Sequence, residues 1–249
     1  MALIDNLLMY YTADNNSAFS DATGNFGNAT VSGPTYTASG KINGGYAFSN
    51  AAHYINAGCA DAGVFANGGI TFNAWVYMNS IGGKRVAESR NVSGKVHYQI
   101  DTVSAGSKYT FYSSDSSGKV LSTSADGYCV TGAWTMVTWV INGTTGKGYI
   151  NGTERCSVTT AGFDSNTFGT MNYNVLGNEN GHVSGMDGTL DEVGLWNRAL
   201  TPTEITTLYQ SGSGLQYPFN TGWSKKILGV TPAKINGVSI SSISKVNGV

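Results

Sequence analysis

Short runs of strand-forming residues recur along the chain, and each run ends at a glycine or asparagine turn. Such runs, rich in Val, Ile, Thr, Tyr and Trp, include GITFNAWVYM, KVHYQI, KYTFYSS and AWTMVTWVI. Asn142-Gly143 and Asn151-Gly152 supply residues that tolerate the positive φ of two-residue hairpin turns. Many short strands with regular turns predict an all-β protein whose sheets pack as a sandwich or jelly roll.

The composition supports a packed domain and argues against two classes of partner. Glycine is common, with 34 in 249 residues against a usual share of about 7%, but 41% hydrophobic residues can build a core. The glycines are therefore interpreted as turns. The formal net charge of -1 gives no electrostatic footprint for nucleic acid or for an anionic membrane. No run approaches the roughly 18 apolar residues of a membrane-spanning helix, so neither partner is expected.

A single helix is predicted near the C-terminal end of the sandwich. Residues 200–205, LTPTEI, hold a Thr N-cap, a Pro at the first helical position and a Glu three residues after the cap, which is a capping box. Leu200 and Ile205 are placed as its hydrophobic staple, and Leu208 and Tyr209 continue the apolar face. A helix of about two turns is unstable alone in water. We therefore expect it to form a lid over an open end of the core.

Several ordered motifs resemble one known family. The segment MDGTLDEVGLWNRALTPTEITTLYQSG, residues 186–212, is similar to the C-terminal signature of the laminin-G-like, concanavalin A-like jelly-roll family. The opening strand and Asp-containing loop of LLMYYTADNNSAFSDATGNFGNATVSG are similar too. The resemblance covers roughly residues 3–212 and implies a jelly-roll β-sandwich domain, taken as residues 1–212, with one short C-terminal helix. The binding members of this family most often bind sugars, so it also implies a lectin-like, carbohydrate-binding role.

Residues 213–249 are predicted to be a C-terminal docking tail. Residues 234–238, KINGV, return as KVNGV at residues 245–249, and each copy splits a β-prone pair at an Asn-Gly turn. A flexible tail is one interpretation, and a small element that pairs its strands with another chain is the other. Such endings resemble the tails of bacteriophage structural proteins. The first residues show no secretory signal, which fits a particle assembled in the host cytoplasm.

The resulting hypothesis is a virion component that belongs to a symmetric oligomeric assembly. Residues 213–249 would contact other virion proteins, and the exposed sandwich would bind glycans or decorate the particle. A purely structural capsid or tail protein without a ligand is one alternative. A polysaccharide-processing enzyme, a glycoside hydrolase or lyase on the same fold, is the other.

A calcium site is implied by the resemblance. Asp14 and Asp21 flank a loop rich in Asn, Ser and Gly, whose carboxylate and carbonyl oxygens are of the kind that Ca²⁺ takes. Related jelly-roll domains often hold a calcium ion at the loop rim, which makes Asp14, Asp21 and Asp191 the candidate ligands. The alternative is that these aspartates cap turns through hydrogen bonds to the backbone.

A sugar-binding loop is predicted at residues 172–185, NYNVLGNENGHVSG. Tyr173, Asn178, Asn180 and His182 could hydrogen-bond sugar hydroxyls and stack on a pyranose face. A solvated connection without a ligand is equally compatible with this sequence. The tryptophans expected in the core are Trp75, Trp134, Trp139 and Trp196. The three cysteines, Cys59, Cys129 and Cys156, are expected to be reduced and mostly buried, with a Cys129–Cys156 bridge as the alternative.

No catalytic residues are predicted. The nearest candidates for a carboxylate pair are Asp187, Asp191 and Glu192. Strand alternation is expected to place Asp191 and Glu192 on opposite faces. Asp187 and Asp191 would share a face with Cα atoms roughly 13 Å apart, whereas glycosidase carboxyl groups lie about 5–9.5 Å apart. Hydrolase, zinc-protease and nucleotide-binding motifs are missing from the sequence, and the histidines, His53, His97 and His182, are far apart in it.

Overall fold

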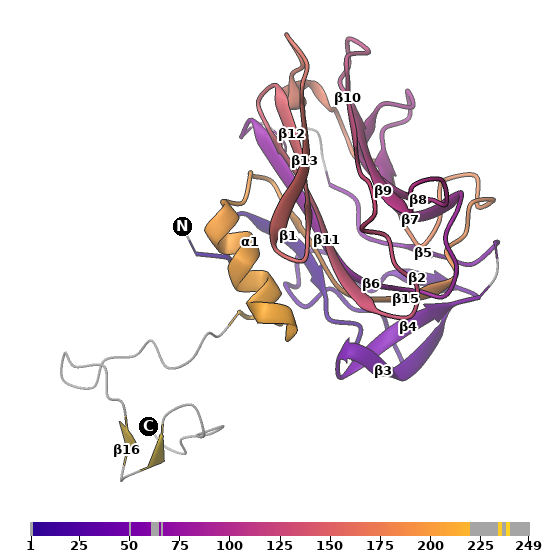
Figure 1. Ribbon diagram of the computed structural model, residues 1–249, viewed down its shortest axis with the longest axis vertical. Coiled ribbons are helices and arrows are strands. Elements are labelled where there is room, and N and C mark those ends of the chain that lie inside the picture. Colours follow the sequence, from indigo (N-terminus) through magenta and orange to yellow (C-terminus); the bar gives the residue numbers. More distant parts are fainter. Residues whose placement is uncertain are drawn as a thin grey trace.

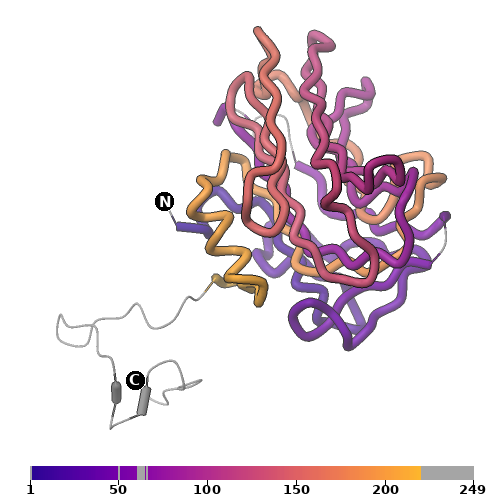
Figure 2. Tube along the Cα trace, in the orientation of Figure 1, coloured from indigo at the N-terminus to yellow at the C-terminus, as the bar shows by residue number. Residues whose placement is uncertain are grey.

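The computed structural model describes residues 2–49, 51–60, 65 and 67–219, and the backbone of residues 234–235 and 238–239. Two antiparallel sheets lie face to face as a β-sandwich (Figures 1 and 2). The larger sheet contains, in spatial order, β13 (Thr153–Thr159), β12 (Thr145–Ile150), β11 (Trp134–Asn142), β6 (Gly69–Met78), β15 (Gly188–Trp196), β4 (Gly44–Phe48) and β3 (Thr35–Ile42), and β1 (Leu7–Tyr11) pairs with β15. The all-β jelly-roll prediction is confirmed.

The second sheet has seven strands. Their spatial order is β10 (Val120–Ala125), β9 (Lys108–Ser114), β8 (Val96–Val103), β7 (Lys84–Arg90), β14 (Tyr173–Leu176), β5 (Tyr54–Asn56) and β2 (Thr30–Ser32). A short 3₁₀ turn, η2 (Ser165–Thr167), precedes β14. In the tail, β16 (Lys234–Ile235) and β17 (Val238–Ser239) form a separate antiparallel pair from the first copy of the repeat. The second copy lies outside the described residues.

Of the two predicted hairpin turns, Asn151-Gly152 forms at the predicted residues and Asn142-Gly143 is displaced by one residue. Ile150 pairs with Thr153, so Asn151 and Gly152 form a two-residue loop, with φ of 52° and 77°. These positive values are the ones that Asn-Gly tolerates best. β11 and β12 are also joined by a two-residue loop, but Asn142 pairs with Thr145, so the loop is Gly143-Thr144 and not the predicted Asn142-Gly143, and Gly143 has a φ of 55°. Local turn chemistry therefore sets the register of this edge of the larger sheet.

The main core fills the space between the two sheets with aromatic rings. Trp139 stacks on Phe111 with centroids 5.4 Å apart, and Phe72 stacks on Tyr98 at 4.5 Å. Each pair joins one strand of the larger sheet to one of the smaller sheet. The Trp139 indole N–H donates to the buried Ser113 hydroxyl at 2.9 Å, so its polar atom is satisfied inside the core.

The helix covers the outer face of the larger sheet, which corrects the prediction of a lid over an open end. α1 (Pro202–Tyr209) has the predicted capping box, and Ile205 and Leu208 are buried. They pack in a second cluster with Trp75, Met136 and Trp196, away from the main core. In Figures 1 and 2 α1 lies beside the N-terminal segment, outside the sandwich. The reason is that this sheet carries apolar side chains on both faces.

The chain continues to pack on the sandwich after the helix. α1 leads into a short 3₁₀ turn, η3 (Gln210–Gly212). Beyond it Leu215 and Phe219 are buried, and Tyr217 stacks on Tyr10 with centroids 6.0 Å apart. The predicted domain boundary at Gly212 therefore lies seven residues before Phe219, the last of these packed residues.

Two further expectations can be compared with the described residues. Trp75, Trp139 and Trp196 are buried as predicted, but Trp134 is only half-buried. All three cysteines are free thiols, so the alternative Cys129–Cys156 bridge does not form, and Cys59 is exposed rather than buried. Among the described helices, none has the length and apolar content needed to cross a membrane.

Candidate functional site

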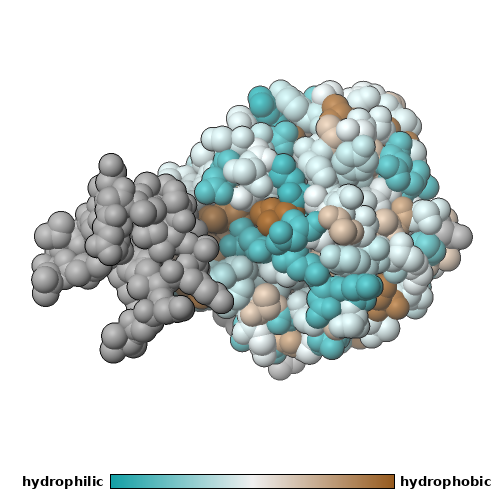
Figure 3. All heavy atoms as spheres, turned by 90° about the horizontal axis from the view of Figure 1, so that it is seen from below, coloured by the Kyte–Doolittle hydropathy of each residue, from teal (hydrophilic) through white to brown (hydrophobic). Residues whose placement is uncertain are grey.

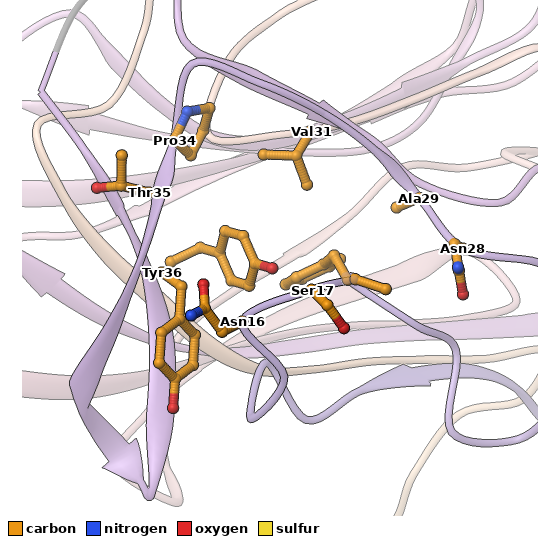
Figure 4. A pocket seen from close by; sticks show the side chains of 11 residues that line it. Asn16, Ser17, Asn28, Ala29, Val31, Pro34, Thr35 and Tyr36 are labelled. Atoms are coloured by element: carbon orange, nitrogen blue, oxygen red, sulfur yellow. The ribbon is translucent and has the colours of Figure 1, made fainter.

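An open hollow lies between the loop after β1 and the β2, β3 and β4 strands (Figure 4). Its volume is about 530 Å³, within the usual range of ligand sites of roughly 300–1,000 Å³. Three kinds of residue line it: neutral polar side chains, aromatic rings and small apolar side chains. These are Asn16, Ser17, Asn28 and Thr35, then Phe19, Tyr36 and Tyr46, then Ala18, Ala29, Val31 and Pro34.

Stacked aromatic rings support the floor of the hollow. Tyr11 stacks on Phe19 at 4.7 Å, and Phe19 meets Tyr46 edge-on at 5.0 Å. The Tyr46 hydroxyl donates to the backbone carbonyl of Asn15 at 2.9 Å, which ties the loop to β4. Burial, followed by the nearby Tyr36, raises the pKa of Tyr46, so it remains a neutral hydroxyl. Tyr36 meets Tyr46 edge-on, with ring centroids 6.1 Å apart.

Polar groups of the hollow are available to a ligand. Asn16 and Asn28 are exposed, and no hydrogen bond within the described residues occupies their side-chain amides or the Tyr36 hydroxyl. Amides and hydroxyls of this kind both donate and accept hydrogen bonds. The hollow can therefore bind a neutral molecule with many hydroxyl groups.

The side chains that line the hollow are all uncharged. None of the eleven residues that line the hollow is Asp, Glu, His, Cys, Lys or Arg. The arrangement described here suits recognition of a ligand.

The surface around this end of the sandwich is mostly polar. Figure 3 looks up at the molecule from below the view of Figure 1, where β3 and β4 lie. This face is mainly hydrophilic or intermediate, with small separate hydrophobic areas. Large contiguous apolar patches are typical of protein interfaces, so this face is better suited to a polar ligand.

Some polar groups of the predicted sugar-binding loop already form hydrogen bonds within the protein. Asn178 is fully buried, its amide donates to Ala51 and His53, and its carbonyl oxygen accepts from Glu179 and Ser184. A side chain with these partners cannot reach a sugar. The prediction that Asn178 binds a sugar is therefore corrected: its side chain holds the loop in place.

The other three predicted residues do not converge on one cavity. Tyr173 begins β14 and is 39% exposed, whereas His182 lies beyond the end of β14 and stacks on Tyr54 with centroids 3.7 Å apart. The backbone N–H of Asn180 donates to the buried Glu88, which is ion-paired with Arg85 and Arg90. The loop therefore lies over a salt-bridge network of the smaller sheet.

The three predicted calcium ligands do not form a common site. Both oxygens of Asp21 accept hydrogen bonds from the turn that follows it, from Thr23 and Phe26, and Asp21 also accepts from the Tyr10 N–H. This is the turn-capping alternative. Asp191 is buried, and burial raises its pKa to about 8, so it is largely protonated at neutral pH. Within the described ranges, no three carboxylate, histidine or cysteine side chains are grouped so as to hold a metal ion.

A β-bulge in β15 places two acidic residues on the same face. The register against β6 shifts between Asp191 and Gly194, and Glu192 has a φ of 51°. Leu190 and Val193 both lie in the main core, so the two carboxyl groups between them face away from it. The prediction that Asp191 and Glu192 lie on opposite faces was wrong, because an extra residue breaks the two-residue period of the strand.

Glu192, together with Asp14, fastens the chain after α1 to the sandwich, whereas Asp191 accepts from the backbone N–H of Ile42. The Tyr10 hydroxyl donates to Glu192 at 2.7 Å, and the Gln216 amide donates to both Glu192 and Asp14, at 2.6 and 2.7 Å. Burial, followed by the charge of Asp191, raises the pKa of Glu192 to about 9. The carboxyl groups of Asp191 and Glu192 are fully buried, so they hold the fold together and do not face a substrate groove. Asp187 accepts hydrogen bonds from the Asn79 amide and the Ser80 hydroxyl.

One sequence feature does mark the hollow, but the prediction made from it concerns a calcium ion and not a sugar. The Asn- and Ser-rich loop between Asp14 and Asp21 was interpreted as a source of calcium ligands, and its Asn16 and Ser17 line the hollow instead. Tyr36 and Asn28 carried no signal of their own. Their convergence depends on how β2, β3 and β4 meet, which neighbouring residues in the sequence do not specify.

Residues 49–206 match the Laminin_G_3 family of the Concanavalin A-like lectin/glucanases superfamily, and the chain belongs to this superfamily. Its fold is thus a lectin/glucanase-like fold of the carbohydrate-binding type. No protein of curated function matches the sequence.

Solved structures share the fold. Domain 4 of AbnA, a GH43 extracellular arabinanase from Geobacillus stearothermophilus, solved in complex with arabinotriose, is 24% identical with a TM-score of 0.61, over 81% of this chain and 97% of that one. The binding domain of Paraclostridial Mosquitocidal Protein 1 is 19% identical with a TM-score of 0.62, over 83% of this chain. The receptor binding domain of botulinum neurotoxin mosaic serotype C/D is 16% identical with a TM-score of 0.65, over 85%. This chain spans about half (52%) of each toxin structure.

Proposed function

We propose that this protein is a non-catalytic glycan-binding module that holds a neutral sugar unit in the hollow. The observation that carries the proposal is the lining, which combines the Tyr36 ring with the free amides of Asn16 and Asn28 and contains no charged residue. Aromatic rings stack on sugar faces, and amides bind hydroxyls. The arabinotriose bound to domain 4 of AbnA supports the ligand class.

Substitution of Tyr36 tests the proposal. A glycan array identifies a bound sugar, and titration calorimetry then compares variants. Loss of one stacked aromatic ring removes about 1–1.5 kcal/mol, so Tyr36→Ala is expected to weaken binding about tenfold. Asn16→Ala is expected to weaken it as well.

The matched control is Tyr173→Ala, which removes an exposed tyrosine of the predicted loop at residues 172–185. It is expected to leave the affinity unchanged. If Tyr173→Ala weakens binding and Tyr36→Ala does not, the sugar binds at that loop instead. Absence of binding to every glycan would favour a purely structural protein.

Calcium is a separate proposal that rests on the family resemblance alone. Asp21 accepts hydrogen bonds from its own turn, whereas the charge of Asp14 acts on Asp191, so Asp14 and Asp191 would supply part of the ligands of a structural Ca²⁺ ion. The same array, repeated after removal of divalent ions with EDTA, separates sugar binding that needs calcium from binding that does not.

We further propose that the module belongs to a bacteriophage virion and attaches to other virion proteins through its tail. The support is the Lys-Ile/Val-Asn-Gly-Val repeat at residues 234–249, which resembles the tails of phage structural proteins. The chain would be made in the host cytoplasm and packed into a symmetric assembly. Because Leu215 and Phe219 pack on the sandwich, the attaching segment is expected to begin after Phe219.

A chain that ends at Phe219 tests this role of the tail. It keeps every described contact of the sandwich and is expected to melt within a few degrees of the full chain, since each 1 kcal/mol shifts Tm by about 2–4 °C in a domain of this size. It is also expected to be lost from purified particles. Co-sedimentation with the particles measures incorporation, and equal incorporation of the two chains would contradict the proposal.

A further inference from the structure

We propose a second sugar-binding surface on the outer face of the larger sheet, a trough beside Trp134. It is lined by Thr37, Ser39, Ala47, Tyr77, Trp134 and Thr189. Its volume is about 350 Å³, and no charged residue lines it. The ligand class is a short neutral oligosaccharide lying across the strands. The trough lies on the opposite face of the larger sheet from the main core, so its test does not depend on the hollow.

Strand register places the trough residues in one row. Trp134 pairs with Tyr77, Tyr77 with Thr189, and Thr189 with Ala47, across β11, β6, β15 and β4. Directly paired residues share a face of the sheet. The neighbours of Tyr77 in β6, Val76 and Met78, point into the main core, so the row faces outward. With strands about 4.8 Å apart, the row spans roughly 14 Å, the length of a short oligosaccharide.

An aromatic wall and a low floor shape the trough. Tyr77 meets Trp134 with ring centroids 5.7 Å apart and an angle of 61° between the rings. The outward positions of β4 carry only Gly45 and Ala47, and a Cβ at position 45 would lie 2.9 Å from the Thr189 methyl. Small residues at these two positions keep the floor low beside the wall, as an extended ligand requires.

Polar groups along the row are free. Within the part of the chain that the structure describes, no hydrogen bond occupies the Tyr77 hydroxyl, the Trp134 indole N–H or the Thr189 hydroxyl. Trp134 is half-buried, whereas Trp75, Trp139 and Trp196 are at most 2% exposed. A half-buried ring beside neutral hydroxyls matches a sugar, which offers an apolar ring face and hydroxyl groups. A charged ligand would find no counter-charge here.

The fluorescence of Trp134 gives a direct readout. Trp223 lies outside the described residues, so the Trp223→Phe variant of the full chain serves as the background. Cellotetraose, xylotetraose and arabinotetraose are the probes. At saturation by one of them, quenching of the accessible fluorescence by acrylamide is expected to fall about twofold or more, as a sugar ring covers the indole.

Two variants and one control assign the signal. Trp134→Phe is expected to remove the accessible fluorescence and its change. Thr189→Arg, which places a long charged side chain in the middle of the row beside Tyr77, is expected to weaken binding at the trough more than about tenfold. Tyr36→Ala is expected to leave the trough signal intact, and far-UV circular dichroism verifies the fold of each variant.

The outcomes separate this proposal from the hollow. No protection of Trp134 by any of the three sugars would overturn the trough, as would protection that persists in Thr189→Arg. Sugar binding that Tyr36→Ala abolishes and Thr189→Arg does not would support the hollow and overturn the trough. Loss of Trp134 protection in Thr189→Arg alone would support the trough, whatever the fate of the hollow.

Discussion

Replacing Arg198 with methionine is expected to lower the free energy of unfolding by about 3–5 kcal/mol, the usual cost of leaving a buried charge without its partner. Arg198 is 5% exposed and donates to both carboxylate oxygens of Glu204, at 2.7 and 2.9 Å. It also donates to the backbone carbonyls of Ala2 and Asp5, at 2.9 and 2.8 Å. The substitution therefore removes the cation that pairs with Glu204, which keeps its capping bonds from Thr201, and the donors to two backbone carbonyls. Urea denaturation at pH 7 measures the loss.

The matched control is the exposed ion pair between Lys147 and Glu154, at 2.9 Å. Lys147→Ala breaks an interaction of the same kind in water and is expected to cost at most about 1 kcal/mol. Equal losses for Arg198→Met and Lys147→Ala would show that the buried pair does not fasten α1 and the N-terminal segment to the sandwich.

The stability of the domain is expected to fall as the pH rises from about 5 to 9. Burial raises the pKa of Asp191 to about 8 and that of Glu192, which also feels the charge of Asp191, to about 9. In the unfolded chain both groups lose their protons near pH 4. Between these values the folded protein binds more protons than the unfolded chain, so the free energy of unfolding falls as the pH rises. Their contribution is complete below about pH 4 and is lost by about pH 9.

Glu192→Gln tests which group is responsible. The variant keeps a neutral polar side chain beside Tyr10 and Gln216 but no longer titrates. Urea denaturation at pH 5, 6, 7 and 8 is expected to give a slope about half that of the parent protein, since one of two titrating groups remains. Glu154→Gln, at an exposed position, is expected to leave the slope unchanged. An unaltered slope in Glu192→Gln would show that this carboxyl group is not neutral in the folded protein.

Local features of this chain could be predicted because neighbouring residues decide them. The turn at Asn151-Gly152 and the capping box of α1 depend on residues within a few positions of each other, and both have the predicted geometry. The strand-rich composition likewise predicted the two packed sheets. Ile205 and Leu208 were expected to be buried from their helical spacing, and they are.

The acidic pair shows where periodicity misleads. A strict two-residue period separates Asp191 from Glu192, but β15 changes partner in this region, from β4 at Gly188–Leu190 to β1 beginning at Val193. The bulge at Glu192 lies between these two pairings. Its position depends on β1, which is about 180 residues away in the sequence, so no local pattern marks it.

The fold class, the turn at Asn151-Gly152, the cap of the helix and the superfamily could all be predicted, because each depends on short-range chemistry or on an ordered set of motifs. Contacts between distant strands determine which face α1 covers, and that Asn178 is buried while Trp134 is half-buried. They also bring Asn16, Asn28 and Tyr36 to one hollow. Burial and convergence depend on which distant strands become neighbours. The sequence of one strand predicts which side chains share a face, but it does not predict which other element packs on that face.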